Sequence, residues 1–327
     1  MKNVPDAADQ PVEQEIFFPV RVTEKDRLAV GIERFELRDP EGGPLPAFTA
    51  GAHLTVLTPR GARRSYSLCN DPAERDRYVL AIKRDPLSRG GSVSMIDDVR
   101  AGDRLQVSTP LNNFELSKRA RKHLFIAGGI GITPIISMMR HLQSEGTENF
   151  HAYYLTRSAE ETAFLSELNR DFAGMVTIHH DGGDTSKALD LWPVLEKPSG
   201  ADIYCCGPQR LMDSVRDMSG HWPSDAVHFE SFGVDSKVRA SNKPFQVRLS
   251  AGRVIEVPAD QSILEALRVS GIRVPSSCES GTCGSCKVRL LGGEAEHRDL
   301  VLSESEQSTQ IMVCVSRAKS HELVLDL

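Results

Sequence analysis

Four cysteines in the last part of the chain have the spacing of metal ligands. Cys278, Cys283 and Cys286 form a C-x4-C-x2-C pattern, and Cys314 follows at a distance. Three clustered thiolates and one remote thiolate are the ligand pattern of a plant-type 2Fe–2S cluster, in which each iron takes two thiolates. Two glycines inside the pattern suit a loop that wraps closely around such a cluster. The pattern predicts a centre for one-electron transfer, with three ligands from one loop and the fourth from a separate strand.

Two other kinds of site also use closely spaced cysteines. Zinc sites favour paired C-x2-C units, and the sequence has one such unit rather than two. Disulfide frameworks are typical of short secreted chains, whereas this chain has 327 residues and a polar start, residues 1–15, without the apolar stretch of a signal peptide. Cys69, Cys205 and Cys206 complete the set of seven cysteines. We therefore expect reduced thiols and a cytoplasmic location.

The segment Arg64-Ser65-Tyr66-Ser67 carries side chains that suit a flavin mononucleotide, FMN. An arginine pairs with a phosphate bidentately, a tyrosine lies against an aromatic ring, and a hydroxyl bonds a ring nitrogen. Residues 90–94 predict a second phosphate contact, at a helix start capped by Ser92 or Ser94. A solvated arginine, a half-buried tyrosine and an ordinary glycine turn are the alternative interpretation. The candidate FMN-binding residues are Arg64, Ser65, Tyr66, Ser67, Ala81, Ile82, Lys83, Gly90, Gly91, Ser92 and Ser94.

A glycine-rich segment, residues 128–134, follows an apolar run and opens a helix, with Thr133 as its expected cap. Such a turn is where a dinucleotide pyrophosphate binds, although the spacing departs from G-x-G-x-x-G. Cys206 ends a later strand at the same edge of the sheet, where its thiol either meets a nicotinamide or is simply buried. Arg157 would suit a 2′-phosphate, so the residues alone leave NADH and NADPH open. The candidate nucleotide-binding residues are Gly128, Gly129, Gly131, Thr133, Pro134, Thr156, Arg157, Cys206, Gly207 and Pro208.

Three successive patterns of elements must position these sites. Short alternating runs between turns predict an antiparallel β-barrel first. Alternating strands and helices, including a helix over residues 160–170, then predict a parallel sheet covered by helices. A hairpin, an amphipathic helix and two strands, the second over residues 311–315, suit a β-grasp ferredoxin domain. The fold class is therefore multidomain, with boundaries expected at 1–115, 116–236 and 237–327.

Charge and hydropathy exclude two classes of function. The net charge of −6 argues against nucleic acid as the main partner, because a basic surface would be expected there. The most apolar stretch, residues 123–139, is interrupted by three glycines and a proline, so it does not predict a membrane span.

Together these segments resemble the phthalate dioxygenase reductase family over essentially the full chain. Residues 64–67 resemble its R-x-Y-S flavin motif, residues 128–134 its G-G-x-G-x-T-P loop, and residues 206–208 its C-G-P motif. Residues 230–232 resemble the segment that closes over the flavin, and the four cysteines fall on its cluster ligands. The resemblance implies a monomeric reductase that takes a hydride from NADH onto FMN and passes electrons singly through the cluster to a Rieske-type oxygenase. It also implies roles near the reacting atoms for Ser67, Cys206 and Phe232.

Other functions remain compatible with parts of this pattern. A non-enzymatic ferredoxin-like carrier would need the cysteine loop, but not the flavin and nucleotide segments. A reductase for another aromatic-acid oxygenase or an O-demethylase would share every motif. A reductase that binds FAD and serves a monooxygenase, and a zinc-bound structural module, are further alternatives. The flavin and the metal content separate these classes.

Overall fold

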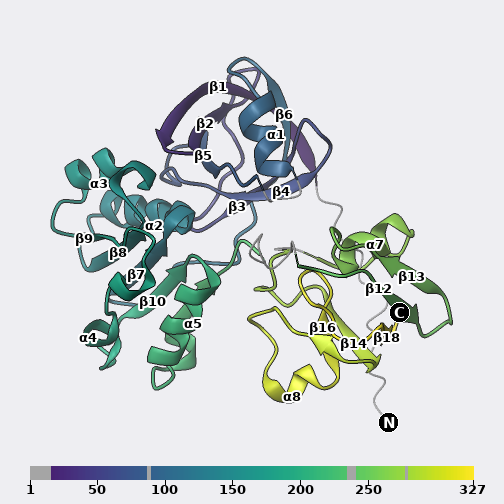
Figure 1. Ribbon diagram of the computed structural model, residues 1–327. Helices are drawn as coiled ribbons and strands as arrows, with labels where there is room; N and C mark the ends of the chain where they lie inside the picture. Colours follow the sequence, from purple (N-terminus) through teal and green to yellow (C-terminus); the bar gives the residue numbers. More distant parts are fainter. Residues whose placement is uncertain (1–15, 87–89, 234–240, 277–278) are drawn as a thin grey trace, which may run out of the picture.

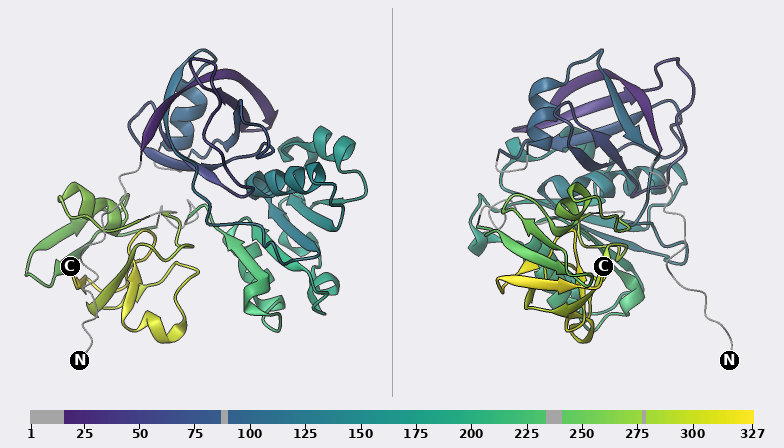
Figure 2. Two further views of the ribbon diagram at one scale, coloured as in Figure 1. Left: turned by 180° about the vertical axis from the view of Figure 1, so that it is seen from behind. Right: turned by 90° about the vertical axis from the view of Figure 1, so that its right-hand side faces the viewer.

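The computed structural model describes residues 16–86, 90–233, 241–276 and 279–327. They form three parts in chain order, which we name the barrel domain, the α/β domain and the β-grasp domain (Figure 1). In this view the barrel lies above, the α/β domain at lower left and the β-grasp domain at lower right. Figure 2 shows the same arrangement from two further sides. The predicted fold class is confirmed.

The barrel domain is a six-stranded antiparallel sheet in the order β4-β3-β6-β1-β2-β5. An isolated bridge between Leu68 and Leu80 joins its two edges. Burial alternates along β1, where Val20 and Val22 enter the core between exposed neighbours, as expected for a half-buried strand. The elements are β1 (Phe17–Ala29), β2 (Ile32–Arg38), β3 (His53–Leu57), β4 (Arg63–Ser67), β5 (Tyr78–Lys83), α1 (Gly91–Asp98) and β6 (Arg104–Ser108).

The α/β domain is a five-stranded parallel sheet in the order β11-β10-β7-β8-β9. Strand β7 is buried along its whole length, which explains its unbroken apolar run. The strands are β7 (His123–Gly128), β8 (Phe150–Thr156), β9 (Val176–His180), β10 (Asp202–Cys206) and β11 (Val227–Glu230). The helical elements are η1 (Gly129–Gly131), α2 (Ile132–Ser144), η2 (Ala159–Glu161), α3 (Leu165–Asp171), η3 (Thr185–Lys187), α4 (Trp192–Leu195), α5 (Gln209–Met218) and η4 (Ser224–Ala226).

One predicted helix of this domain is wrong in extent. The helix expected over residues 160–170 is two separate elements, η2 and α3. Phe164 between them has a positive φ of 60° and is buried in the core. The backbone at Phe164 is left-handed, which lets its ring pack into the core. Because an α-helix needs negative φ angles, the helix cannot run through this position.

The β-grasp domain holds a mixed sheet in the order β13-β12-β18-β14-β16. Ser262 and Glu265 form a reciprocal capping box at the start of α7. The strand predicted over residues 311–315 ends at Met312, because the chain turns there and Ser316 N–H bonds back to the Met312 carbonyl at 3.0 Å. The elements are β12 (Phe245–Leu249), β13 (Val254–Val257), α7 (Ile263–Val269), β14 (Lys287–Gly292), β15 (Ala295–Glu296), α8 (Glu304–Gln307), β16 (Gln310–Met312), β17 (Arg317–Ala318) and β18 (Glu322–Leu325).

The buried side chains divide unevenly among the three parts. One cluster joins residues of the barrel domain, such as Ile32 and Phe114, to residues of the α/β domain, such as Phe125 and Tyr204. The main cluster of the β-grasp domain contains residues of that domain alone. Across the described ranges, none of the helices is both long and apolar enough to cross a membrane.

Candidate flavin, nucleotide and cluster sites

Strand β4 presents two buried hydroxyls that have no hydrogen-bond partner among the described residues. They are the Tyr66 hydroxyl and Ser67 Oγ, and Ser67 is 4% exposed. Burial raises the pKa of Tyr66, so its hydroxyl stays protonated at neutral pH. Leaving a buried polar group without a partner costs about 1–3 kcal/mol. The two hydroxyls therefore fit an aromatic ligand that carries hydrogen-bonding ring atoms, as a flavin does.

The two predicted phosphate-binding segments lie in contact. A Cβ atom on Gly91 would lie 2.5 Å from Cγ and 2.7 Å from Nε of Arg64, so only glycine lets this arginine lie across the start of α1. Gly90, with φ at +80°, occupies the cap position of that helix. An arginine beside a helix N-terminus suits a phosphate. This is the arrangement that the FMN prediction requires.

The predicted caps of α1 are wrong. Ser92 and Ser94 lie inside the helix, and no side chain caps its start. Ser92 Oγ accepts a bond from Asp85 N–H at 3.1 Å, and Ser94 Oγ accepts one from Arg60 N–H at 3.2 Å. Because Gly90 turns the chain with a positive φ, the helix begins before both serines. Their hydroxyls therefore bond to neighbouring loops and do not cap the helix.

The remaining FMN candidates lie on β4 and β5. Ala81 and Ile82 are buried and pack into two different clusters on either side of the sheet. Ser65 and Lys83 are exposed. These four residues keep their predicted role as expectations, since their burial alone identifies no ligand.

The two predicted nucleotide motifs meet at one edge of the parallel sheet. A Cβ atom on Gly131 would lie 2.1 Å from the Cys206 carbonyl oxygen, and one on Gly128 would lie 2.6 Å from Pro208 Cδ. Gly207 in turn packs against the backbone of Gly128. The strand order reverses between β7 and β10, which is the position where open α/β sheets bind ligands. These glycines let the two motifs pack backbone against backbone at this edge, whereas a Cβ atom on Gly129 would meet nothing within 4 Å.

The predicted cap of α2 is also wrong. Thr133 is the second residue of the helix, and its hydroxyl donates to the Ile130 carbonyl at 3.0 Å. The 3₁₀ turn η1 begins the helical run at Gly129, so that Gly131 takes the cap position. Pro134 stays in the first turn, as expected.

Thr156 and Arg157 differ in how they face the same edge. Thr156 Oγ1 lies 2.8 Å from Thr162 Oγ1 and 2.8 Å from His180 Nδ1, so its hydroxyl is engaged within the protein. Arg157 is exposed. His180 and Thr162 were not among the predicted site residues, because the sequence gives no sign that they lie beside Thr156.

Cys206 and Glu230 form a buried pair at the ends of adjacent strands. They are register partners on β10 and β11, and they are 0% and 8% exposed. Burial, with the Glu230 carboxylate adding to it, raises the pKa of the Cys206 thiol far above its ordinary value. The thiol is therefore a neutral, polarizable group rather than a nucleophile. Glu230 was not among the predicted site residues, although an acid at the end of an apolar strand is a usable signal.

The cysteine loop packs against the turn that carries Cys314. Gly281 and Gly284 have φ angles of +80° and +82°, as a wrapped loop requires. A Cβ atom on Gly281 would lie 2.7 Å from Val315 Cγ2, which is next to Cys314. Cys314 therefore lies in a turn after β16 and not within a strand as predicted.

The cluster ligands can be placed only in part. Cys286 and Cys314 are buried, Cys283 is half-buried, and Cys278 lies outside the described residues. Within the described ranges, which leave out that fourth thiol, no three metal-ligating side chains form a group that would hold a metal ion. The positive-φ glycines and the clustering of loop and turn fit a 2Fe–2S cluster.

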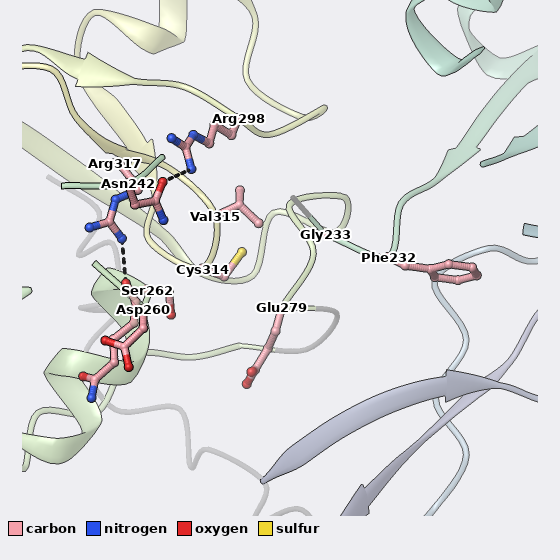
Figure 3. Close-up of a pocket in the computed structure, with 11 residues that line it drawn as sticks. Phe232, Gly233, Asn242, Asp260, Ser262, Glu279, Arg298, Cys314, Val315 and Arg317 are labelled. Carbon is pink, nitrogen blue, oxygen red and sulfur yellow. Dashed lines mark hydrogen bonds between the residues drawn. The ribbon is translucent and has the colours of Figure 1, made fainter. Parts of the chain in front are cut away.

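A polar cleft lies between the α/β domain and the β-grasp domain (Figure 3). It is lined by Phe232 and Gly233 on one side and by Cys314 and Val315 on the other, with Glu279 between them. Phe232 is 46% exposed, which is unusual for a phenylalanine and fits a side chain that covers a ligand. Phe232 and Cys314 thus both border this cleft, and the Phe232 ring points to the side away from Cys314 (Figure 3).

Comparisons with known proteins identify the iron-sulfur domain and the family. A family model described as a 2Fe-2S iron-sulfur cluster binding domain matches residues 247–319. Phthalate dioxygenase reductase of Burkholderia cepacia is 58% identical over 318 residues, covering 96% of this chain and 99% of the relative. The phthalate 4,5-dioxygenase oxygenase reductase subunit of Pseudomonas putida is 60% identical over 314 residues, covering 95% of this chain and 97% of the relative.

A solved structure agrees with the same assignment. That structure, of a phthalate dioxygenase reductase, is described as modular and as transferring electrons from pyridine nucleotides to 2Fe-2S. It matches with a TM-score of 0.83 at 58% identity, over 95% of this chain and 98% of the other. The chain therefore belongs to the phthalate dioxygenase reductase family.

Proposed function

We propose that this protein is an NADH-dependent reductase that delivers electrons to an aromatic-ring-hydroxylating oxygenase of the phthalate type. With FMN and a 2Fe–2S cluster bound, the protein takes a hydride from NADH and releases the two electrons singly, which is the chemistry these groups supply. The observation that carries the proposal is the cleft shared by Phe232 and Cys314, because it brings the flavin side and the cluster side of the chain together.

The barrel domain holds the flavin. Arg64 and the start of α1 bind its phosphate, and the hydroxyls of Tyr66 and Ser67 gain partners on its ring. Ser65, Lys83 and the backbone of Ala81 and Ile82 complete the site. Phe232 covers the ring from the α/β domain and keeps water away from the reacting face.

The α/β domain holds NADH at the edge of the sheet where residues 128–131 pack against residues 206–208. Gly129, where a Cβ atom would meet nothing within 4 Å, allows the pyrophosphate to approach the backbone at the start of α2. Cys206 is 0% exposed in this structure, and we propose that its neutral thiol meets the nicotinamide when the nucleotide binds, with Glu230 beside it. Thr156 and Arg157 border the adenosine end.

We further propose the domain limits 1–115, 116–236 and 237–327, a monomeric state and a Rieske-type oxygenase as the acceptor. The separate core of the β-grasp domain supports the last boundary. Cys278, Cys283, Cys286 and Cys314 are the proposed cluster ligands.

Cofactor content tests the proposal directly. Purified protein is denatured, the released flavin is identified by chromatography, and iron and sulfide are counted. We expect FMN with two irons and two sulfides per chain. FAD, zinc, or a cluster without any flavin would contradict the proposal, and the last result would favour a simple electron carrier.

A variant then separates the two electron-transfer steps. Cys286→Ser removes one cluster ligand, so NADH should still bleach the flavin absorbance while acceptors that depend on the cluster lose their electron supply. Reduction of a phthalate-type oxygenase is compared with reduction of an O-demethylase oxygenase, which identifies the acceptor. Unchanged delivery to the oxygenase in Cys286→Ser would contradict the assigned path.

A further inference from the structure

A short loop of the β-grasp domain, residues 297–301, is held in one conformation by a buried acid. We name it the docking loop. The Asp299 side chain is 0% exposed. Its Oδ2 accepts bonds from Val301 N–H at 3.2 Å and Leu302 N–H at 2.8 Å, and its Oδ1 accepts one from Ser316 Oγ at 3.4 Å. The loop is therefore fixed to the segment that carries Cys314.

Leu300, at the tip of the docking loop, contacts two domains at once. Its N–H donates to the Gly281 carbonyl at 2.9 Å, inside the cysteine loop. Its half-buried side chain packs against an apolar cluster whose buried members all belong to the α/β domain, including Ile126, Ile203 and Met212. An apolar contact from the β-grasp domain thus reaches the α/β domain directly beside the cluster ligands.

Two arginines tie the docking loop and the Cys314 turn to the chain that enters the domain. Arg298 Nη1 donates to Asn242 Oδ1 at 3.0 Å (Figure 3). Arg298 Nε and Nη2 each donate to the Glu296 carboxylate at 2.9 Å. Arg317, which is 4% exposed, donates to the Lys243 carbonyl at 2.9 Å and to the Pro258 carbonyl at 3.1 Å. The loop is therefore fixed both to the start of the domain and to the cysteine loop.

We propose that the docking loop sets the position of the cluster relative to the flavin, with Leu300 as its anchor on the α/β domain. This inference rests on the proposed function, since it concerns the electron transfer within it. Leu300 is a positioning residue that touches neither cofactor through its side chain. Electron transfer slows steeply with separation, so loss of the anchor slows only the step between flavin and cluster.

The test compares Leu300→Ala and Leu300→Asp with the control Leu291→Ala, an exposed leucine of the same domain. Stopped-flow absorbance follows flavin reduction by NADH and then cluster reduction, and small-angle X-ray scattering follows the spread of the domains. We expect the second step to slow about ten- to a hundred-fold, more in Leu300→Asp, with a larger radius of gyration. Flavin reduction and the cluster spectrum stay unchanged, and the control matches wild type.

Three results are distinguishable. Unchanged transfer and unchanged scattering in both Leu300 variants overturn the proposal. A slowed transfer that comes with an altered cluster spectrum also overturns it, because Leu300 would then support the cluster loop and not the domain position. Failure of NADH to reduce any cluster in the wild-type protein would instead count against the proposed function itself.

Discussion

The two domain contacts of this molecule are built differently. The barrel and α/β domains share one buried cluster, in which the Phe114 and Tyr204 rings pack edge to face with centroids 5.6 Å apart. The β-grasp domain keeps its own core and meets the α/β domain through a polar cleft and Leu300. The first contact resembles a single domain interior and the second resembles a transient interface.

Hydrogen bonds also join the barrel domain to the α/β domain. Across the first contact, Arg140 Nη1 donates to the Cys69 carbonyl at 2.6 Å and Ser137 Oγ donates to the Asn70 carbonyl at 2.8 Å. A hydride moves only between atoms in contact, so the parts that hold its donor and acceptor must be rigidly joined. Single electrons cross longer gaps than a hydride does, so the third domain needs a smaller contact, as long as that contact keeps the cluster near the flavin.

Removing the weakly attached domain gives the largest expected effect. A chain ending at Ser236 should fold, bind FMN and oxidise NADH with artificial acceptors, because the barrel and α/β domains share their own core. Its reduction of cluster-dependent acceptors should fall to zero. Flavin content and NADH oxidation are measured beside the full chain; an insoluble or flavin-free fragment would show that the two contacts do not differ as described.

Removing a side chain from the buried cluster that the barrel and α/β domains share should lower the stability of both domains together. Phe114→Ala removes a ring that is 3% exposed and should cost about 3–5 kcal/mol of unfolding free energy. The urea midpoints of unfolding that are followed by flavin fluorescence and by far-ultraviolet circular dichroism should both fall, and by the same amount. The matched change in the β-grasp core, Phe245→Ala, should leave the flavin transition where it is. A flavin transition that moves equally in both variants would contradict the comparison.

Arg64 tests the barrel side of the site. Arg64→Ala should weaken FMN binding roughly ten- to a hundred-fold, because it removes charge-assisted bonds to the phosphate. Riboflavin lacks the phosphate and should bind wild type and variant almost equally. The control is Arg63→Ala, since the Arg63 guanidinium lies over the Phe17 ring. Equal FMN affinity in wild type and Arg64→Ala would show that the FMN phosphate does not bind at Arg64.

The smallest effect concerns acid stability of the barrel. Burial raises the pKa of Glu36, but hydrogen bonds from Arg38, Arg77 and Thr23 outweigh it and hold the pKa at about 2 instead of 4.5. A lowered carboxyl pKa stabilises the fold above the unfolded value, and the contribution is lost as the pH falls from about 4.5 to about 2. Glu36→Gln should cost about 1–2 kcal/mol at pH 7.

Urea titrations of the Glu36 variant at pH 7 and pH 3 check the sign. The difference from wild type should shrink at the lower pH. Asp76→Asn removes a partner of Arg38 whose side chain is 65% exposed, and it should change stability by less than about 1 kcal/mol. A difference that grows on acidification would show that Glu36 does not titrate as described.

The sequence predicted the multidomain fold class and most strands, because the apolar residues recur differently along them, from alternation in β1 to the unbroken run in β7. The roles that it assigned to the flavin and nucleotide motifs stay predictions. Helix starts were predicted less well, since Gly90 and Gly131 take cap positions that the serine and threonine rules assign to neighbours. The pairing of Glu230 with Cys206 and the domain contact of Leu300 were missed, because they depend on which strands and domains lie side by side.

Three thiols have a consequence for the handling of the protein. Cys69, Cys205 and Cys206 are each 0% exposed. Burial raises the pKa of Cys69 to about 12 and raises that of the other two as well. Alkylating and oxidising reagents attack the thiolate, so these three sulfurs resist both in the folded protein. Damage during storage in air should therefore begin in the cysteine loop near Cys283. The brown colour of the 2Fe–2S cluster should then fade before the yellow colour of the flavin.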